Sequence, residues 1–306
     1  MSELAKNGTP GVPGAEGTFW IRSESLAMIR CPTFHFTPPS SDEVKRVLWK
    51  GPAAAISYVI EPNEHFPPNT WLYLCQDQSY IVEKLSKAAR RDVRRALRSL
   101  VIAPIDWPVL LEKGWKAYSE TETRIGLSDD SPVTFRRHYE HFSKNPCHHV
   151  IGAWKDDSLV AFMTLVVVDD WVEIEGSFFA DAHKGLCPSN GLAHYVLDHF
   201  LVQRKFRTVS YGMSSIQEEN GKTGLHAYKT KVGFEARPAH RIFVFHPLLH
   251  PFVNRLSLRI MNTALRIMPG DRRLKKAAGV LAKMISTANS ETSKQNYYGN
   301  DCTRSS

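Results

Sequence analysis

The chain has 306 residues, of which 42% are hydrophobic and 23% charged, so it has enough apolar sequence for one large domain or two ordinary ones. Its formal net charge of +8 favours an anionic partner, and cofactor phosphates, nucleic acid or a lipid surface would all satisfy it. Five cysteines stand singly without a CxxC pair, which argues against a disulfide framework and indicates a cytoplasmic protein. The longest apolar run, Leu159 to Val168, has only about ten residues, whereas a membrane-spanning helix needs about 20.

Residues 1–17 are polar and rich in Gly and Pro, and they lack the apolar core of a secretory signal. They predict a disordered tail, as do residues 289–306, which are rich in Ser, Thr and Asn. The first predicted elements are a helix over 41–50 that begins near Ser41, and strands over 54–60 and 71–75.

A strongly basic helix is predicted next, with Ser86 as its candidate cap. Apolar residues recur at helical spacing at Leu85, Ala89, Val93, Ala96 and Leu100. The opposite face carries the basic side chains Lys87, Arg90, Arg91, Arg94, Arg95 and Arg98. Two further helices follow, one from Asp106 to about Thr123 and one from Ser131 to before Asn145.

Three consecutive strands are then predicted over 149–154, 159–168 and 171–179, joined by short Asp-containing turns. A helix over 191–204, a strand over 208–211, a helix over 225–232 and a strand over 241–245 follow them. A meander followed by strand–helix–strand alternation predicts an α+β fold with a mixed, mostly antiparallel sheet flanked by helices. The parallel crossover around the helix at Gly191 would leave a splayed edge at which a cofactor could lie.

Three segments carry candidate chemistry. Ser189, Asn190, Gly191 and Ala193 open a helix, and the free amides of a helix start favour phosphate groups, although an ordinary capped turn would look the same. Glu173, Glu175 and Ser177 would share one face of a strand, where a carboxylate could act as a general base or could simply face water. Tyr211, Ser214 and Ser215 follow a strand, and Tyr228 and Lys229 lie on the next helix, where the tyrosine could equally be a core residue.

The order of these segments resembles that of FemAB-like proteins, a branch of the GNAT superfamily of acyltransferases. The resemblance covers about residues 80–246. It is carried by LSKAARRDVRRAL (85–97), PSNGLAHYVLDHFLVQRKFRTVSYGMSS (188–215) and GLHAYKTKVGFE (224–235). Two positions depart from the pattern of ordinary GNAT enzymes: Pro188 stands where Gln or Arg is usual, and Lys229 stands where a tyrosine often lies.

The resemblance implies a GNAT-type fold, often built of two related halves, and direct transfer of an acyl group to an amine. On it we expect an N-terminal half over 18–105, a C-terminal GNAT domain over 106–250 and a helical extension over 251–288. Acyl-CoA would be the donor substrate. Glu175 or Glu173 would act as the base, Tyr228 and Lys229 would assist, Ser189, Asn190, Gly191 and Ala193 would bind the cofactor, and Tyr211, Ser214 and Ser215 would bind the substrate. A tRNA-dependent aminoacyltransferase and a non-catalytic basic binding module stay open as alternatives, and the histidines show no metal-binding spacing.

The segment 251–285 combines apolar residues at helical spacing with Arg255, Arg259 and Arg266 and a later basic cluster. This pattern is typical of a helix that lies on a membrane surface. It also fits a pair of helices, broken at Pro269-Gly270, that cover the sheet and keep their basic side in water. We favour the covering helices.

Overall fold

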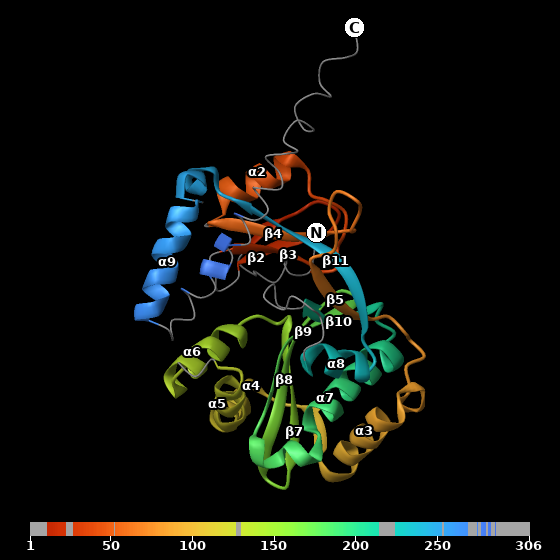
Figure 1. Ribbon diagram of the computed structural model, residues 1–306. Coiled ribbons are helices and arrows are strands. Elements are labelled where there is room, and N and C mark those ends of the chain that lie inside the picture. Colours follow the sequence, from red (N-terminus) through yellow and green to blue (C-terminus); the bar gives the residue numbers. More distant parts are fainter. Residues whose placement is uncertain are drawn as a thin grey trace.

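The computed structural model describes residues 11–22, 27–51, 53–126, 130–213, 224–252 and 254–268, and seven positions between 274 and 285. The described chain forms two lobes that share one eleven-stranded sheet (Figure 1). The strands lie in the order β1-β2-β3-β4-β11-β5-β10-β9-β8-β7-β6. Their bounds are β1 Gly11–Pro13, β2 Phe19–Arg22, β3 Ala27–Cys31, β4 Ala55–Ile60, β5 Thr70–Cys75, β6 Val101–Pro104, β7 His148–Lys155, β8 Ser158–Val168, β9 Trp171–Phe179, β10 Thr208–Met213 and β11 Glu235–Phe245.

The α-helices are α2 Ser41–Lys50, α3 Lys87–Ser99, α4 Trp107–Lys113, α5 Trp115–Arg124, α6 Pro132–Phe142, α7 Pro188–Leu197, α8 Gly224–Lys231 and α9 Arg255–Ile267. Short 3-10 segments lie at Val82–Lys84, Asp181–Leu186 and Pro247–Phe252, and a π-helical turn at Asp198–Gln203 extends α7. Polar residues begin several of these helices, because their side chains accept a hydrogen bond from an otherwise free amide of the first turn. Ser40, Ser86 and Ser131 cap α2, α3 and α6 in this way.

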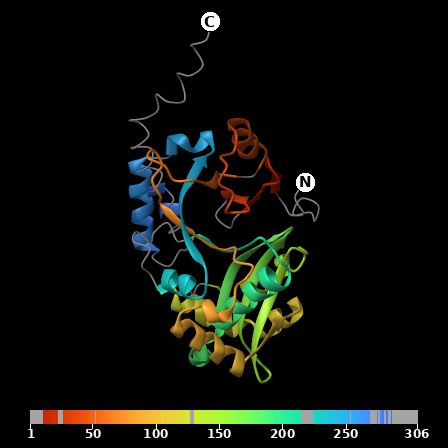
Figure 2. The same ribbon diagram turned by 90° about the vertical axis from the view of Figure 1, so that its right-hand side faces the viewer.

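Strand β11 joins the two lobes. Its first half, Glu235–Ala239, pairs with β5, and its second half, His240–Phe245, pairs with β4. Figure 2 shows the strand running from one lobe into the other. The predicted domain boundary at residue 105 falls inside this continuous sheet. Strand β5, before the boundary, pairs with β10, and β6, also before it, pairs with β7.

Helices cover both faces of the lower lobe. The main core lies between one face of the sheet and helices α3, α7 and α8, and it includes the fully buried Leu192 and Val196 of α7. An aromatic cluster fills the other face, where Leu110, Phe135 and Tyr139 of α4 and α6 pack on Phe162 of β8. Burial of such side chains is the main favourable contribution to folding.

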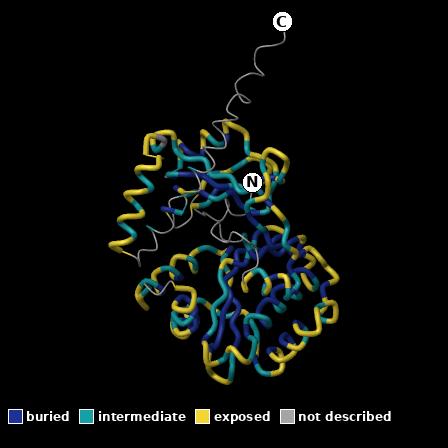
Figure 3. Tube along the Cα trace, viewed as in Figure 1, coloured by how far each residue is buried: buried dark blue, intermediate teal, exposed yellow. Residues whose placement is uncertain are grey.

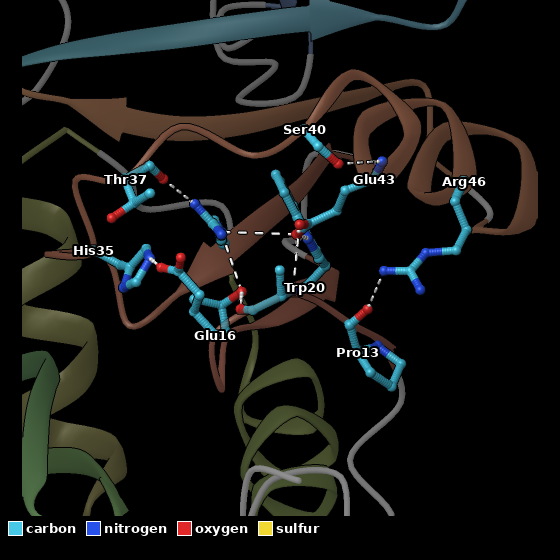
Figure 4. A network of polar contacts seen from close by, with 11 residues as sticks. Pro13, Glu16, Trp20, His35, Thr37, Ser40, Glu43 and Arg46 are labelled. Atoms are coloured by element: carbon cyan, nitrogen blue, oxygen red, sulfur yellow. Dashed lines mark hydrogen bonds and ion pairs between the residues drawn. The ribbon is translucent and has the colours of Figure 1, made fainter.

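The upper lobe packs α2 against one face of β2–β4 around a buried polar network (Figure 4). Glu43 accepts a 2.7 Å hydrogen bond from the indole of Trp20, and its carboxylate lies 3.8 Å from the guanidinium of Arg30. Arg30 also donates to the backbone carbonyl of Thr37. A buried charge is tolerated only when it is paired and hydrogen-bonded, so this network fixes the loop that follows β3.

Most of the predicted elements of the lower lobe are present in the structure. The meander, the basic helix and the α7–β10–α8 order are confirmed. The prediction of a disordered tail through residue 17 is wrong for residues 11–17, which form β1 and the turn into β2. Strands β2, β3 and β6 were not predicted, and the tail 289–306 and most of 269–285 lie outside the described residues.

Candidate functional site

The sheet opens between β9 and β10, which are parallel neighbours. They pair only at Trp171–Glu173 and Thr208–Ser210, although β9 continues to Phe179 and β10 to Met213. This confirms the splayed edge expected from the crossover around α7. Strands that diverge leave backbone amides and carbonyls available to a ligand, and crevices of this kind at strand ends are common binding sites.

Glu173 is the last residue of the paired stretch and lies on the face turned to the upper lobe. Its carboxylate accepts a 2.9 Å hydrogen bond from the hydroxyl of Thr33, which is buried in the loop after β3. Burial, together with the nearby charge of Glu175, raises the pKa of Glu173 to about 7, although Thr33 and Lys229 act in the opposite direction. A carboxyl with this pKa exchanges protons readily near neutral pH, as a general base must.

Glu175 lies in a different environment two residues further on. A β-bulge between the Thr164–Gly176 and Leu165–Ile174 pairs leaves it as the extra residue of β9. One of its carboxylate oxygens lies 3.2 Å from Nδ1 of His148, whose ring packs on Phe142. The carboxylate thus has a partner that can hold it in a fixed orientation when the imidazole is protonated.

The bulge also corrects the expectation that Ser177 shares a face with the two glutamates. The extra residue reverses the alternation of the strand, so Ser177 pairs with the core residue Met163 and lies on the opposite face. There Oγ of Ser177 lies beside the Tyr211 hydroxyl and influences its pKa. No described atom completes a well-aligned hydrogen bond to this Oγ.

A lysine surrounded by aromatic rings occupies the Ser177 side of the opening. Lys229 of α8 is buried, and its ammonium donates a 2.7 Å hydrogen bond to the backbone carbonyl of Tyr211. The same nitrogen lies 4.3 Å from the ring centroid of Tyr73 and 4.8 Å from that of Tyr211, which is cation–π geometry. These contacts dock α8 on the sheet at the point where β10 leaves β9.

Tyr228 connects α8 to the start of α7. Its hydroxyl donates a 2.8 Å hydrogen bond to the backbone carbonyl of Ser189. Burial raises the pKa of Tyr228 and of its neighbour Tyr211, so both phenols stay protonated at neutral pH. In the structure the Tyr228 hydroxyl proton holds the α7 turn, and the assisting role expected of Tyr228 stays a prediction.

The predicted cofactor-binding residues at the start of α7 divide into two groups. Gly191 and Ala193 are buried in the main core, and a Cβ on Gly191 would lie 2.6 Å from Ile102 and 2.8 Å from Ala96. Glycine is therefore needed here for close packing of α7 on α3. Ser189 and Asn190 are partly exposed, and the Nδ2 of Asn190 is buried without a hydrogen-bond partner in the described chain.

Some amides of this turn are already used. Those of Asn190 and Gly191 donate to the carbonyl of Cys187, and Pro188 has none. A ligand at this helix start would therefore be held mainly by the Asn190 side chain and the Ser189 region. Ser214 and Ser215 lie outside the described residues, while Tyr211 is buried beside the opening.

Two cavities of about 300 Å³ in the described chain lie elsewhere. One is lined by Asp106, His149 and Arg204 among others, and the other by Glu83, Arg94 and His194 among others. Neither of them includes Glu173 or Lys229 in its lining. The half-buried carboxyl of Glu173, with its raised pKa, and the orphaned donors make the β9–β10 opening the candidate site, because perturbed titratable groups at a crevice mark functional positions.

Of the residues at the opening, the sequence predictions named Glu173, Tyr228 and Lys229, did not name Thr33, and placed Ser177 on the wrong face of β9. Thr33 is 140 residues from its partner Glu173, and no local pattern connects the two.

The fold is similar to that of FemX. The FemX crystal structure matches with a TM-score of 0.52 at 9% identity, over 78% of this chain and 89% of that chain. The C-terminal domain of a putative lysylphosphatidylglycerol synthetase from Agrobacterium fabrum matches with a TM-score of 0.50 at 15% identity, over 88% and 92%. A tandem GNAT protein from the clavulanic acid biosynthesis pathway matches at 0.42 and 11% identity, over 75% and 78%.

No protein-family model and no curated sequence matches the chain. At these identities the likeness shows the fold alone, so the chemistry has to be argued from the site itself.

Proposed function

We propose that the protein is an acyltransferase that moves an acyl group directly onto an amine at the β9–β10 opening. The observation that carries the proposal is the carboxyl of Glu173, with a pKa of about 7, at the point where the two strands part. Its burial and its hydrogen bond from Thr33 hold it in one place, as a base that acts on a positioned substrate requires.

In this proposal Glu173 takes a proton from the ammonium form of the acceptor. The free amine then attacks the acyl carbon, a C–N bond forms, and the bond to the leaving group breaks. The leaving group departs as a thiolate, and the second proton that the nitrogen loses as the amide forms passes to this thiolate through water or a nearby phenol. Glu175 would orient His148 and help to position the acceptor amine. Glu173 is therefore the preferred base of the two glutamates.

The donor is proposed to be an acyl thioester of CoA. Asn190 and Ser177 each offer a buried polar atom without a good partner. Ser177 lies beside the linked hydroxyls of Tyr211 and Tyr228, and Asn190 follows Ser189, whose carbonyl accepts the Tyr228 hydrogen bond. Buried donors of this kind are usually satisfied by water or by a ligand. In this proposal these two side chains would hold the polar part of the donor, and Lys229 would hold β10 in place beside it.

Aminoacyl-tRNA is the second candidate donor, because α3 presents a solvent-exposed basic face. Arg91, Arg94, Arg95 and Arg98 are exposed along it, as the sequence predicted. Phosphate contacts made by such a face would give a binding affinity that falls steeply with salt.

The test combines ligand binding with turnover. Acetyl-CoA, longer acyl-CoA and free CoA are screened for an increase in melting temperature, and those that stabilise are incubated with a panel of amines and analysed by mass spectrometry. We expect stabilisation by acyl-CoA and an acylated amine that Glu173→Gln no longer forms, whereas Glu175→Gln retains part of the activity. Full activity of Glu173→Gln would refute the proposed base.

The two donors are separated by tRNA binding at two salt concentrations. Neutralising Arg91, Arg94 and Arg95 together should leave stability nearly unchanged, since exposed charges contribute little. If this variant loses a salt-dependent affinity for tRNA that the wild type possesses, the donor is aminoacyl-tRNA. If neither protein binds tRNA, that alternative fails.

A further inference from the structure

Exposed apolar side chains concentrate around helix α9. Of the thirteen large hydrophobic side chains that are exposed in the described chain, six lie between Leu248 and Met268. Three of them, Leu256, Ile260 and Ile267, are 65%, 61% and 76% exposed. No residue of α9 is buried, and α9 lies along the outside of the upper lobe (Figures 1 and 3).

The spacing of these residues places them on one side of the helix. Leu256, Ile260 and Ile267 are separated by four and seven residues, which returns each to the same face of an α-helix. The half-buried Leu258, Met261 and Leu265 form a second apolar face that turns toward the protein. The expectation that this segment simply covers the sheet therefore accounts for only one of its two apolar faces.

Arginines flank the outward apolar face at each turn. Arg255, Arg259 and Arg266 each precede one of its members by one residue, and all three are exposed. The sequence from Ala236 to Gly270 contains no Asp or Glu, and no described carboxylate pairs with these arginines. An arginine can bury its aliphatic stem beside an apolar stripe and still keep its guanidinium at a charged surface.

We infer that α9 is a membrane-surface helix that docks the protein on an anionic lipid bilayer. The outward apolar face would enter the boundary between headgroups and acyl chains, and the three arginines would contact the lipid phosphates. None of the described helices is long and apolar enough to cross a bilayer, so the contact would be made by a helix lying flat on the surface.

Charge makes a second copy of this chain a poor occupant of the same surface. A two-fold contact would bring the same arginines of two molecules together without an acidic residue between them, and like charges across an interface oppose association. A nucleic acid would satisfy the arginines but would leave the apolar face in water. A lipid surface satisfies both features at once.

The test uses the full-length protein and sedimentation with vesicles. Wild type should bind vesicles that contain phosphatidylglycerol, bind vesicles of phosphatidylcholine alone far more weakly, and lose affinity as salt is raised. Replacing Arg255, Arg259 and Arg266 by Gln should lower the partition coefficient roughly 100-fold, because each basic residue contributes several-fold at an anionic surface. Replacing Leu256, Ile260 and Ile267 by Gln should lower it at least about tenfold.

A matched control replaces exposed apolar residues of the other lobe. Ile125→Gln combined with Val133→Gln should leave vesicle binding unchanged, and circular dichroism should show all variants folded. The inference is independent of the proposed transfer reaction, so binding is measured without substrates. Equal binding by wild type and the α9 variants, or no binding of wild type to anionic vesicles at low salt, would overturn it. A dimer that the apolar substitutions dissolve, without vesicle binding, would overturn it as well and assign the surface to self-association.

Discussion

Replacing Glu173 by Gln should slow transfer by orders of magnitude and yet stabilise the folded protein above neutral pH. The raised pKa means that the folded state holds the Glu173 proton more tightly than the unfolded state does. The corresponding stabilisation is complete below the ordinary pKa of 4.5 and is lost as the pH rises through about 7. Ionising the carboxyl in place therefore costs at most about 3.4 kcal/mol, from the difference between these two pKa values. Because the side chain is partly exposed, we expect about 1–2 kcal/mol after solvent screening.

Gln cannot ionise, and it keeps an oxygen that can accept the Thr33 hydrogen bond. Urea unfolding of wild type and variant should give nearly equal free energies at pH 4 and a more stable variant at pH 8. Glu112→Gln on α4 controls for the loss of one negative charge at an exposed site. Turnover should fall by about 10²–10⁴, the usual contribution of a general base. A variant that is no more stable than wild type at pH 8 would show that Glu173 titrates like an ordinary surface glutamate, and the argument for a tuned base would be refuted.

Three further substitutions test contacts of the proposed site: the Thr33 hydrogen bond, the packing of α7 on α3 and the Tyr228 hydrogen bond. Thr33→Val removes a hydrogen bond that lowers the pKa of Glu173, so the pH at which kcat/KM is half-maximal should rise, while Thr33→Ser should keep it. Gly191→Ala should destabilise the protein by about 1–3 kcal/mol in urea unfolding through overpacking, whereas Gly185→Ala, with open space around its Cβ, should be neutral. Tyr228→Phe removes the hydrogen bond to the α7 turn and should cost about 1 kcal/mol, and the donor KM should rise more than kcat falls. A drop in kcat alone would instead indicate that the phenol donates a proton in the reaction.

The lower lobe could be predicted because its elements are long and strongly periodic. The β8 run is almost entirely apolar, and the α3 stripe repeats at helical spacing beside an opposite basic face. The upper lobe was harder to predict, because β1, β2 and β3 have only three to five residues each. Their pairing, and the Arg30–Glu43 contact behind them, join segments distant in sequence, so no local pattern contains them.

The same dependence on distant segments limits the prediction of single residues at the site. Strand alternation correctly placed Glu173 but failed at Ser177, because one extra residue at Glu175 inverts every later position of the strand. A glycine before a helix suggested a ligand, and the structure gives Gly191 a packing role against α3. The sequence alone shows neither the bulge at Glu175 nor the close approach of Gly191 to α3, because each depends on a strand or helix from elsewhere in the chain.

The position of Thr33 gives the upper lobe a part in the proposed chemistry. The loop that carries Thr33 follows β3, and the buried network of Arg30, Glu43 and Trp20 fixes that loop by holding the carbonyl of Thr37. The Thr33 hydroxyl in turn reaches Glu173 in the lower lobe and lowers its pKa, opposing burial. A carboxyl buried without this contact would hold its proton more tightly and would be a poorer base at neutral pH. Substitutions in the Arg30–Glu43 network, far from the β9–β10 opening in sequence, should therefore move the pH profile of the reaction as well as stability, which a purely structural network would not do.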